Sequence, residues 1–403
     1  MPPQSRIPQL ADRVQHFTES VIREMTRVAQ QHNAINLGQG MPDFDAPESV
    51  KEAACRAIRD GVNQYSISWG APELRRAISR KAAEFNGLEC DPDREITVCC
   101  GATECMMASM LAIINPGDEV VIFQPFYENY GPDALLSGAT PRWVRLRPPD
   151  WQFDPEELRA AFTSRTKAII LNSPNNPTGR VFSRSELELI ADLCQKHNTF
   201  VVSDEIYEYI RHTTAPHISI ATLSGMADRT ITISGLSKTF SMTGWRLGYC
   251  LAPQALTTAI RKAHDFLTVG APHPLQIAGA AALNLPGTYF DELSAAYTCR
   301  RNILMPYLKQ AGFRCQPPEG AYYVMADTTD FQTGLDDREF VMRMIELVGV
   351  SAVPGTSFHS PRELGTNQVR FMFSKRDETL HEAGRRLLNL RQALGKNHDS
   401  INS

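Results

Sequence analysis

The feature that most constrains this chain is a series of short apolar runs between residues 46 and 290, separated by segments of helical periodicity. The runs lie at 96–98, 119–123, 168–171, 200–202, 230–233 and 248–251. Strands that are buried on both faces of a parallel sheet read as continuous apolar runs, and parallel strands need a crossover helix between them. The pattern therefore predicts an α/β domain with a mainly parallel sheet between helices.

The pattern changes after about residue 295. A helical pattern at 297–311 is followed by an apolar run at 322–325, a helical pattern at 337–348 and a second run at 369–373. This mixture predicts a smaller α+β domain. We expect three parts: an N-terminal arm with part of the small domain at 1–45, a large domain at 46–292 and a C-terminal small domain at 293–403.

The composition excludes several classes of protein. Lys+Arg number 41 and Asp+Glu 45, a net charge of −4, so the chain lacks the basic surface of a nucleic-acid binder. No stretch reaches the roughly 18 apolar residues of a membrane span, since the richest one, 98–114, contains Glu104. Nine scattered cysteines without a CxxC motif indicate a reducing compartment, which we take to be the cytoplasm, and no metal site.

Residues suited to ligand binding follow the apolar runs, where the carboxyl ends of parallel strands meet. Gly101-Ala102-Thr103 opens a helical pattern, and such a turn can hold a phosphate on its backbone N–H groups. A plain strand–helix turn is the alternative. Tyr127 follows the run at 119–123, where its ring could stack on a planar ligand or pack in the core.

Polar side chains follow the next two runs. Asn176 lies in a turn that two prolines and a glycine fix, and it presents an amide. Asp204 comes at the end of the run at 200–202, where a carboxylate needs a partner. It could hold the proton of a ring nitrogen, or it could cap a helix. Tyr207 follows it and offers a phenol.

Lys238 gives the strongest chemical signal. It follows the run at 230–233 among small residues, and poor solvation there lowers the pKa of an amine and makes it a nucleophile. Arg246, eight residues later, offers a guanidinium group for phosphate. A surface lysine and a structural arginine are the alternative, which the compatible chemistry at the other strand ends disfavours.

Together these residues supply an amine, an acid, an amide, phenols, an aromatic face and a phosphate site. This is the set of groups that pyridoxal phosphate requires. The motifs GxxxxGK[ST], HExxH and GxSxG are absent from the sequence. Gly38-x-Gly40-x-x-Asp43 lacks the third glycine of a dinucleotide-binding fingerprint.

At these residues the sequence resembles the class I and II aminotransferases, which are fold-type I pyridoxal-phosphate enzymes. The resemblance extends from about residue 17 to 388, and its most specific part, 235–248, fits the family's lysine signature. Segments 175–179 and 204–207 add independent matches, and 36–44 with 369–373 point to the aspartate, aromatic and kynurenine branch. The resemblance implies a seven-stranded, mainly parallel sheet in the large domain.

The resemblance also implies roles for single residues. Lys238 would bind the cofactor as a Schiff base and then act as the general base, while Asp204 would keep the ring nitrogen protonated. Asn176 and Tyr207 would hydrogen-bond the phenolic oxygen of the ring, and Tyr127 would stack on its face.

Further residues would hold the phosphate and the substrate. The phosphate would be bound by Arg246 and by the backbone of Gly101, Ala102 and Thr103. Arg370 would bind the α-carboxylate of the substrate through two guanidinium nitrogens, helped by Asn176 and the Gly38 backbone.

Tyr65 resembles the tyrosine that reaches the cofactor phosphate of the neighbouring subunit, which implies a homodimer. One position departs from the commonest family pattern. Many relatives carry a phosphate-binding serine three residues before the lysine, where this chain has Gly235. Ser237 is the nearest replacement for that hydroxyl, and Ser234 is the second.

The reaction expected from the resemblance is ping-pong transfer of the α-amino group of an L-amino acid to a 2-oxo acid. The default donors are aspartate, aromatic amino acids and kynurenine, and the default acceptor is 2-oxoglutarate. A β-lyase, a synthase or an oxidase on the same scaffold is the alternative, because it would share Lys238, Asp204 and Arg370. An amino-acid sensor without catalysis would need a DNA-binding module, for which the segment before residue 17 is too short.

Side-chain specificity stays open in the sequence. A second arginine could mark a dicarboxylic substrate, and the candidates are Arg13, Arg75 and Arg76. Trp69 could line a pocket for aromatic substrates, although packing at an interface is the favoured interpretation.

Overall fold

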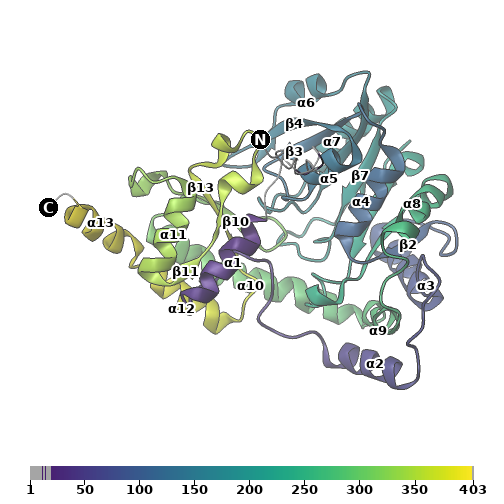
Figure 1. Ribbon diagram of the computed structural model, residues 1–403, viewed down its shortest axis with the longest axis horizontal. Helices are drawn as coiled ribbons and strands as arrows, with labels where there is room; N and C mark the ends of the chain where they lie inside the picture. Colours follow the sequence, from purple (N-terminus) through teal and green to yellow (C-terminus); the bar gives the residue numbers. More distant parts are fainter. Residues whose placement is uncertain (1–10, 12–13, 15–19, 402–403) are drawn as a thin grey trace, which may run out of the picture.

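An eight-stranded sheet forms the centre of the larger part of the molecule (Figure 1). The computed structural model describes residues 11, 14 and 20–401, by backbone alone from residue 396. The strand order is β2-β9-β8-β7-β6-β3-β4-β5. The strands are β2 (Ile96–Cys99), β3 (Glu119–Gln124), β4 (Thr140–Arg147), β5 (Gln152–Phe153), β6 (Thr166–Asn172), β7 (Phe200–Asp204), β8 (Thr230–Gly235) and β9 (Gly248–Leu251).

The central strands of this sheet run parallel. Strands β4, β3, β6, β7 and β8 pair with one another in parallel, whereas β9 is antiparallel to both β8 and β2, and β5 is antiparallel to β4. The predicted mainly parallel sheet is confirmed, with the two-residue β5 as an additional edge strand.

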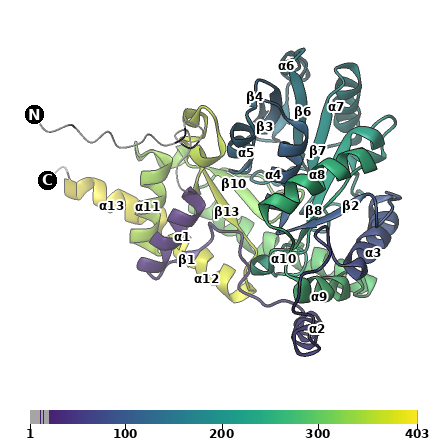
Figure 2. The same cartoon turned by 45° about the vertical axis from the view of Figure 1, so that its right-hand side comes forward.

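Helices cover both faces of the sheet (Figures 1 and 2). Val120 and Ile122 of β3 pack in one core, together with residues of α4, whereas Val121 and Phe123 pack in another, together with residues of α7. Side chains alternate across a strand, so both faces of β3 are buried, and its sequence is continuously apolar. The helices of this part are α2 (Glu48–Arg59), α3 (Pro72–Lys81), α4 (Ala102–Ile113), α5 (Tyr130–Ser137), α6 (Pro155–Ala161), α7 (Arg184–Lys196), α8 (Gln254–Leu267) and α9 (His273–Leu283).

The smaller part is built on a three-stranded antiparallel sheet of order β10-β13-β12 and on a short parallel pair, β1 with β11. Its strands are β1 (Ile35–Asn36), β10 (Tyr323–Asp327), β11 (Val350–Ser351), β12 (Val353–Pro354) and β13 (Gln368–Met372). Its helices are α1 (Val21–Gln31), α10 (Gly287–Ala311), α11 (Asp337–Val348), α12 (Asp377–Leu387) and α13 (Leu390–Ile401).

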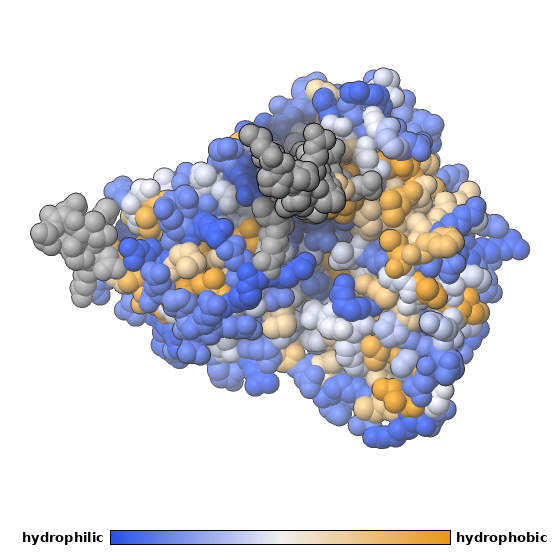
Figure 3. Space-filling model, in the orientation of Figure 1, coloured by the Kyte–Doolittle hydropathy of each residue, from blue (hydrophilic) through white to orange (hydrophobic). Residues whose placement is uncertain are grey.

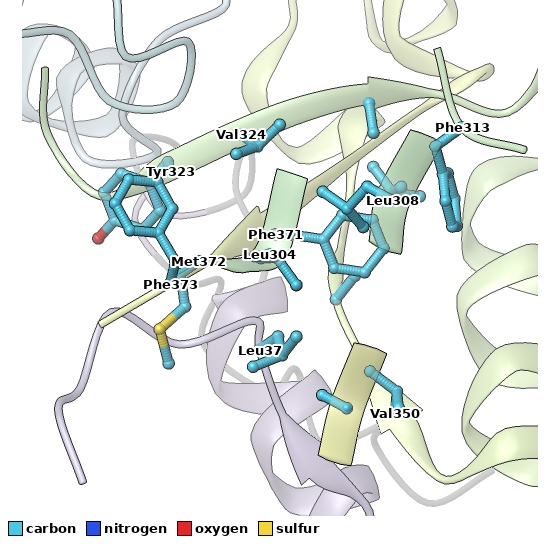
Figure 4. Close-up of a cluster of buried hydrophobic side chains, with 14 of the residues drawn as sticks. Leu37, Leu304, Leu308, Phe313, Tyr323, Val324, Val350, Phe371, Met372 and Phe373 are labelled. Carbon is cyan, nitrogen blue, oxygen red and sulfur yellow. The ribbon is translucent and has the colours of Figure 1, made fainter. Parts of the chain in front are cut away.

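The N-terminal segment packs into this smaller part. Figure 4 shows Leu37 among side chains of α10 and β13, such as Leu304 and Phe371, and all three are buried.

The domain boundary that the sequence predicts at residue 292 falls inside helix α10, which continues without a break on both sides of it. The boundary stays a prediction. Among the helices described, none combines the length and the apolar character needed to cross a membrane.

Candidate active site

A cavity of about 500 Å³ opens beside the carboxyl ends of β6, β7 and β8, between the two parts of the molecule. The sequence-predicted residues on its wall are Ala102, Thr103, Tyr127, Asn176, Asp204, Tyr207, Ser237, Lys238, Arg246 and Arg370. Strand register brings them together, because Asn172 at the end of β6 is paired with Asp204 at the end of β7, and Asp204 with Ile233 of β8.

Asn172 fixes the turn that carries Asn176. Its amide Nδ2 donates a 2.9 Å hydrogen bond to the backbone carbonyl of Asp204, and its Oδ1 accepts a 2.7 Å bond from the backbone N–H of Asn176. The turn after β6 is therefore tied to the end of β7, and the side chains of Asn176 and Asp204 face one cavity.

The amine of Lys238 faces this cavity without a counter-ion. The residue is partly buried, and its amine makes neither a hydrogen bond nor an ion pair with any described residue. Burial lowers the pKa of Lys238, and Arg370 and Arg246 lower it further, against opposing effects of Tyr323 and Asp204. A larger neutral fraction makes the amine a nucleophile and a base.

The carboxyl of Asp204 is almost completely buried. Burial raises its pKa to about 6, although hydrogen bonds from the Tyr130 hydroxyl (2.8 Å) and the Ile206 N–H (3.2 Å) favour the carboxylate. The helix-cap interpretation is wrong, because a turn follows β7 at residues 206–209 and not a helix. The carboxyl is instead available to a protonated group in the cavity.

The first turn of α4 lies beside a guanidinium group and is suited to an anion. Arg246 donates to the backbone carbonyl of Thr243 at 3.1 Å and has no acidic partner in the described chain. Gly101 has a φ of +88°, and a Cβ there would collide with the Arg246 guanidinium. The missing side chain thus lets a cation and the positive end of α4 converge, which fits a phosphate group.

Gly235, where many relatives carry serine, is tightly packed. A Cβ at this position would lie 2.9 Å from the backbone carbonyl oxygen of Leu247. Ser234 donates its hydroxyl to Glu208 at 2.6 Å, so it is not a replacement for the absent serine. Ser237 lies on the cavity wall and remains the candidate.

Arg370 is a buried cation that faces no carboxylate of the described chain. Its guanidinium donates to Oδ1 of Asn176 at 2.8 Å and to the backbone carbonyl of Gly38 at 2.7 Å, while its Nε has no partner. The rings of Tyr323 and Phe358 lie 4.2 and 4.8 Å from it, measured from ring centroid to Cζ. A carboxylate in the cavity would balance this charge.

Other predicted residues lie off the cavity wall. Tyr65 is 86% exposed. Arg75 is buried against Asp93 (2.5 Å), Arg76 is exposed beside Glu73 (3.8 Å), and Arg13 lies outside the described residues. Trp69 packs against Arg261, with 4.7 Å between its ring centroid and Cζ, which agrees with a packing role. Neither Arg75 nor Arg76 can read a second carboxylate in this cavity.

The sequence patterns missed several residues on the wall, among them Arg23, Tyr130 and Tyr323. Tyr130 comes three residues after Tyr127 and is joined to it by a turn, in which the Tyr130 N–H donates to the Tyr127 carbonyl at 3.0 Å. This short spacing could have revealed it. Tyr323 belongs to the run at 322–325 that predicted only a strand, and its hydroxyl lies 3.1 Å from that of Tyr207. Arg23 is on α1, and no local pattern links it to the strand ends.

These groups fit pyridoxal phosphate. The amine suits its aldehyde, the Arg246 turn its phosphate, Asp204 its ring nitrogen, and Asn176 and Tyr207 its phenolic oxygen.

Comparison with known proteins gives a consistent result. The family model for aminotransferase class I and II matches residues 32–387. The methionine aminotransferase of Escherichia coli is 36% identical over 96% of this chain and 98% of its own length. The kynurenine–oxoglutarate transaminase of Dictyostelium discoideum is 38% identical over 93% of this chain and 95% of its own.

A solved structure shares the whole fold. The N-succinyldiaminopimelate aminotransferase of Mycobacterium tuberculosis has a TM-score of 0.91 and 39% identity, over 95% of this chain and all of that one.

Proposed function

The chain belongs to the class I and II aminotransferase family and is a pyridoxal-phosphate-dependent transaminase, and from this premise we propose its substrates and the roles of its residues. One observation carries the proposal: the amine of Lys238 and the buried guanidinium of Arg370 line the same cavity, and neither has a carboxylate partner among the described residues. An α-amino acid presents the complementary carboxylate.

Five side chains hold the cofactor in this proposal. Arg246 and the first turn of α4 bind the phosphate, and Asp204 holds the protonated ring nitrogen. Asn176 and Tyr207 donate to the phenolic oxygen, and Tyr127 covers the ring. When bound, the cofactor supplies an aldehyde carbon for the amino group and a ring that accepts electrons from the α-carbon.

Arg370 and Lys238 perform the substrate steps. Arg370 binds the α-carboxylate and so fixes the position of the α-carbon. With the cofactor bound, the Lys238 amine would take up the α-proton of the substrate and then deliver it to the cofactor. The lowered pKa of Lys238 favours the neutral amine that this transfer needs. Release of one oxo acid before the second binds makes the cycle ping-pong.

Residues of α1 and the loop after β1 on the cavity wall favour a donor with a long uncharged side chain, and 2-oxoglutarate as the acceptor. Ile22 and Met41 give this wall apolar surface. Arg23 is exposed beside Ile22 and could bind the distal carboxylate of the acceptor. The relatives named for methionine and for kynurenine with oxoglutarate agree with this pairing.

An exposed apolar surface supports a homodimer. Tyr65 (86% exposed), Ile67, Phe266 (92%), Leu267 and Val269 form this surface, which we call the partner-facing patch. Figure 3 shows apolar residues gathered over the region where Figure 1 places α4 and α8, the helix that carries Phe266. In the proposed dimer, Tyr65 reaches the cofactor phosphate of the partner subunit.

The nine cysteines support a cytoplasmic protein. All of them are free thiols, and the thiols of Cys99, Cys105 and Cys250 lie within 4.8 Å of one another without a disulfide. Such neighbours persist as thiols in a reducing compartment.

The proposal is tested by single turnovers. The protein loaded with pyridoxal phosphate is mixed with one amino acid and no oxo acid, and pyridoxamine phosphate is quantified by chromatography. We expect stoichiometric conversion, fastest with methionine, kynurenine or aromatic donors. Accumulation of pyruvate and ammonia without pyridoxamine phosphate would support the lyase alternative instead.

A further inference from the structure

Glu104 and His264 form a buried hydrogen-bonded pair behind the first turn of α4. Oε1 of Glu104 lies 2.7 Å from Nδ1 of His264 and accepts a 2.7 Å bond from the Thr268 hydroxyl. Oε2 accepts a 2.5 Å bond from the backbone N–H of Cys100. The other ring nitrogen of His264, Nε2, lies 2.8 Å from the backbone carbonyl of Ser68.

The geometry favours a doubly protonated imidazole at His264. Hydrogen bonds from His264, Thr268 and Cys100 outweigh burial and lower the pKa of Glu104, which favours its carboxylate. Both ring nitrogens of His264 then face oxygen acceptors, the carboxylate and the Ser68 carbonyl, and each contact is a hydrogen bond when the nitrogen carries a proton. Burial lowers the pKa of His264, but the contact with Glu104 outweighs it and raises the pKa above its ordinary value. Among the described residues, the thiols of Cys99 on β2 and Cys250 on β9 also face the ring.

The pair connects two functional regions of the molecule. At one end, the N–H of Cys100 begins the turn that leads through Gly101 into α4, the proposed phosphate site. At the other end, Ser68 and Thr268 belong to the two segments that carry the partner-facing patch, 65–69 and 266–269.

We propose that Glu104 and His264 are positioning residues that hold the phosphate-binding turn against the two segments of the partner-facing patch. The inference rests on the proposed function, because it takes the turn at Gly101 as the phosphate site. The pair orients backbone N–H groups toward the phosphate, and the same contacts fix the segment from which Tyr65 would reach the partner subunit.

The test compares pyridoxal phosphate with pyridoxal, which lacks the phosphate. Equilibrium dialysis of the wild-type protein, Glu104→Gln and His264→Gln gives the dissociation constant of each compound. We expect each variant to weaken pyridoxal phosphate binding by about tenfold or more and pyridoxal binding by less than about twofold. Thr268→Val, which removes a single hydrogen-bond donor, should give about a threefold loss for pyridoxal phosphate alone.

His217→Gln is the matched control. His217 and Glu205 form a second buried pair at 2.7 Å in the same part of the molecule. This variant should lower the melting temperature as much as His264→Gln does, with the ratio of the two dissociation constants unchanged. Sedimentation velocity should show a weakened dimer for Glu104→Gln and His264→Gln only.

Each outcome has one meaning. If Glu104→Gln and His264→Gln weaken the binding of both compounds equally, or leave the binding of both unchanged, the positioning role is overturned and the proposed function stays intact. Should these two variants fail to fold, an unchanged ratio in Thr268→Val would overturn it. A wild-type protein that binds pyridoxal as tightly as pyridoxal phosphate would instead overturn the proposed phosphate site.

Discussion

Two lysines with the same side chain occupy opposite environments in the larger part of the molecule. The amine of Lys81 lies 2.5 Å from the carboxylate of Glu208 and donates to Asn86 at 2.8 Å, and all three side chains are nearly fully buried. The amine of Lys238 faces a cavity and has no such partner in the described chain. Removal from water with a partner makes a lysine structural, and removal without one makes it reactive.

The neighbouring carboxylates show the same difference. Burial raises the pKa of Glu208, but Lys81, His217 and Asn86 outweigh it and hold the pKa below its ordinary value. Asp204 lacks a matching cation, and burial raises its pKa to about 6. In the active site, therefore, the buried charges lack partners that a ligand can supply. Lys81 and Glu208, in contrast, neutralise each other.

Replacing the unpartnered lysine should have the largest effect. Lys238→Ala should lower turnover by more than about 10⁴-fold, because it removes both the attachment point and the base. Thermal denaturation should show a stability equal to or above wild type, since no ion pair is lost. Steady-state rates with methionine and 2-oxoglutarate measure the first effect, and turnover near the wild-type rate would contradict the role of Lys238.

Replacing the partnered lysine should damage the fold and spare the chemistry. Lys81→Met should cost about 3–5 kcal/mol of unfolding free energy, because Glu208 is left charged and buried. Urea denaturation measures this loss, and turnover per folded molecule should stay within about threefold of wild type. The double variant Lys81→Met/Glu208→Leu should recover part of the stability. A large loss of turnover in folded Lys81→Met would remove the contrast between the two lysines.

Arg370 is a second buried cation without a carboxylate partner in the described chain, and its replacement should affect the substrate. Arg370→Ala should lower kcat/KM by about 10²- to 10³-fold for every amino acid, because the α-carboxylate loses a buried cation. Arg23→Ala is the matched control, and it should raise KM for 2-oxoglutarate and leave KM for methionine unchanged. If Arg370→Ala affected a single class of amino acid, Arg370 would read the side chain instead.

The smallest effect concerns Tyr130. Tyr130→Phe removes the hydroxyl that favours the Asp204 carboxylate, so the pKa of Asp204 should rise above about 6. Binding of pyridoxal phosphate needs the carboxylate, so binding weakens as the pH falls. In Tyr130→Phe this weakening should begin at a higher pH than in the wild type. At pH 6 we expect a loss of up to about tenfold.

The stability of the fold changes with pH in the opposite direction to cofactor binding. In the cofactor-free protein, protonated Asp204 stabilises the fold below its unfolded pKa, and this stabilisation is lost as the pH rises to about 6. Melting temperatures from pH 4 to 7 check this trend, and Tyr130→Phe should shift its upper end to higher pH. Identical profiles for both proteins would show that Tyr130 does not control Asp204.

The ends of the central strands could be predicted from the sequence, because the apolar pattern of a buried strand is local. Apolar runs that are buried on both faces predicted the central strands, and the residues after them had to meet at one edge of a parallel sheet. The sequence alone therefore places Asn176, Asp204 and Lys238 near one another. Strand β4 was not predicted, since it alternates polar and apolar residues at the side of the sheet where only the short β5 follows.

The sequence by itself determined the fold class, the cofactor and the loop chemistry, because the apolar runs and the residues that directly follow them are local patterns. The tertiary structure decided which charges are compensated. Arg75 and Arg370 are both buried arginines, but Arg75 pairs with Asp93, whereas Arg370 donates to a carbonyl and an amide and faces no carboxylate of the described chain. The contact between Arg370 and Asn176 joins residues 194 positions apart, and only packing of the two parts creates it. Whether a buried charge is structural or reactive depends on such distant partners, which no local periodicity reports.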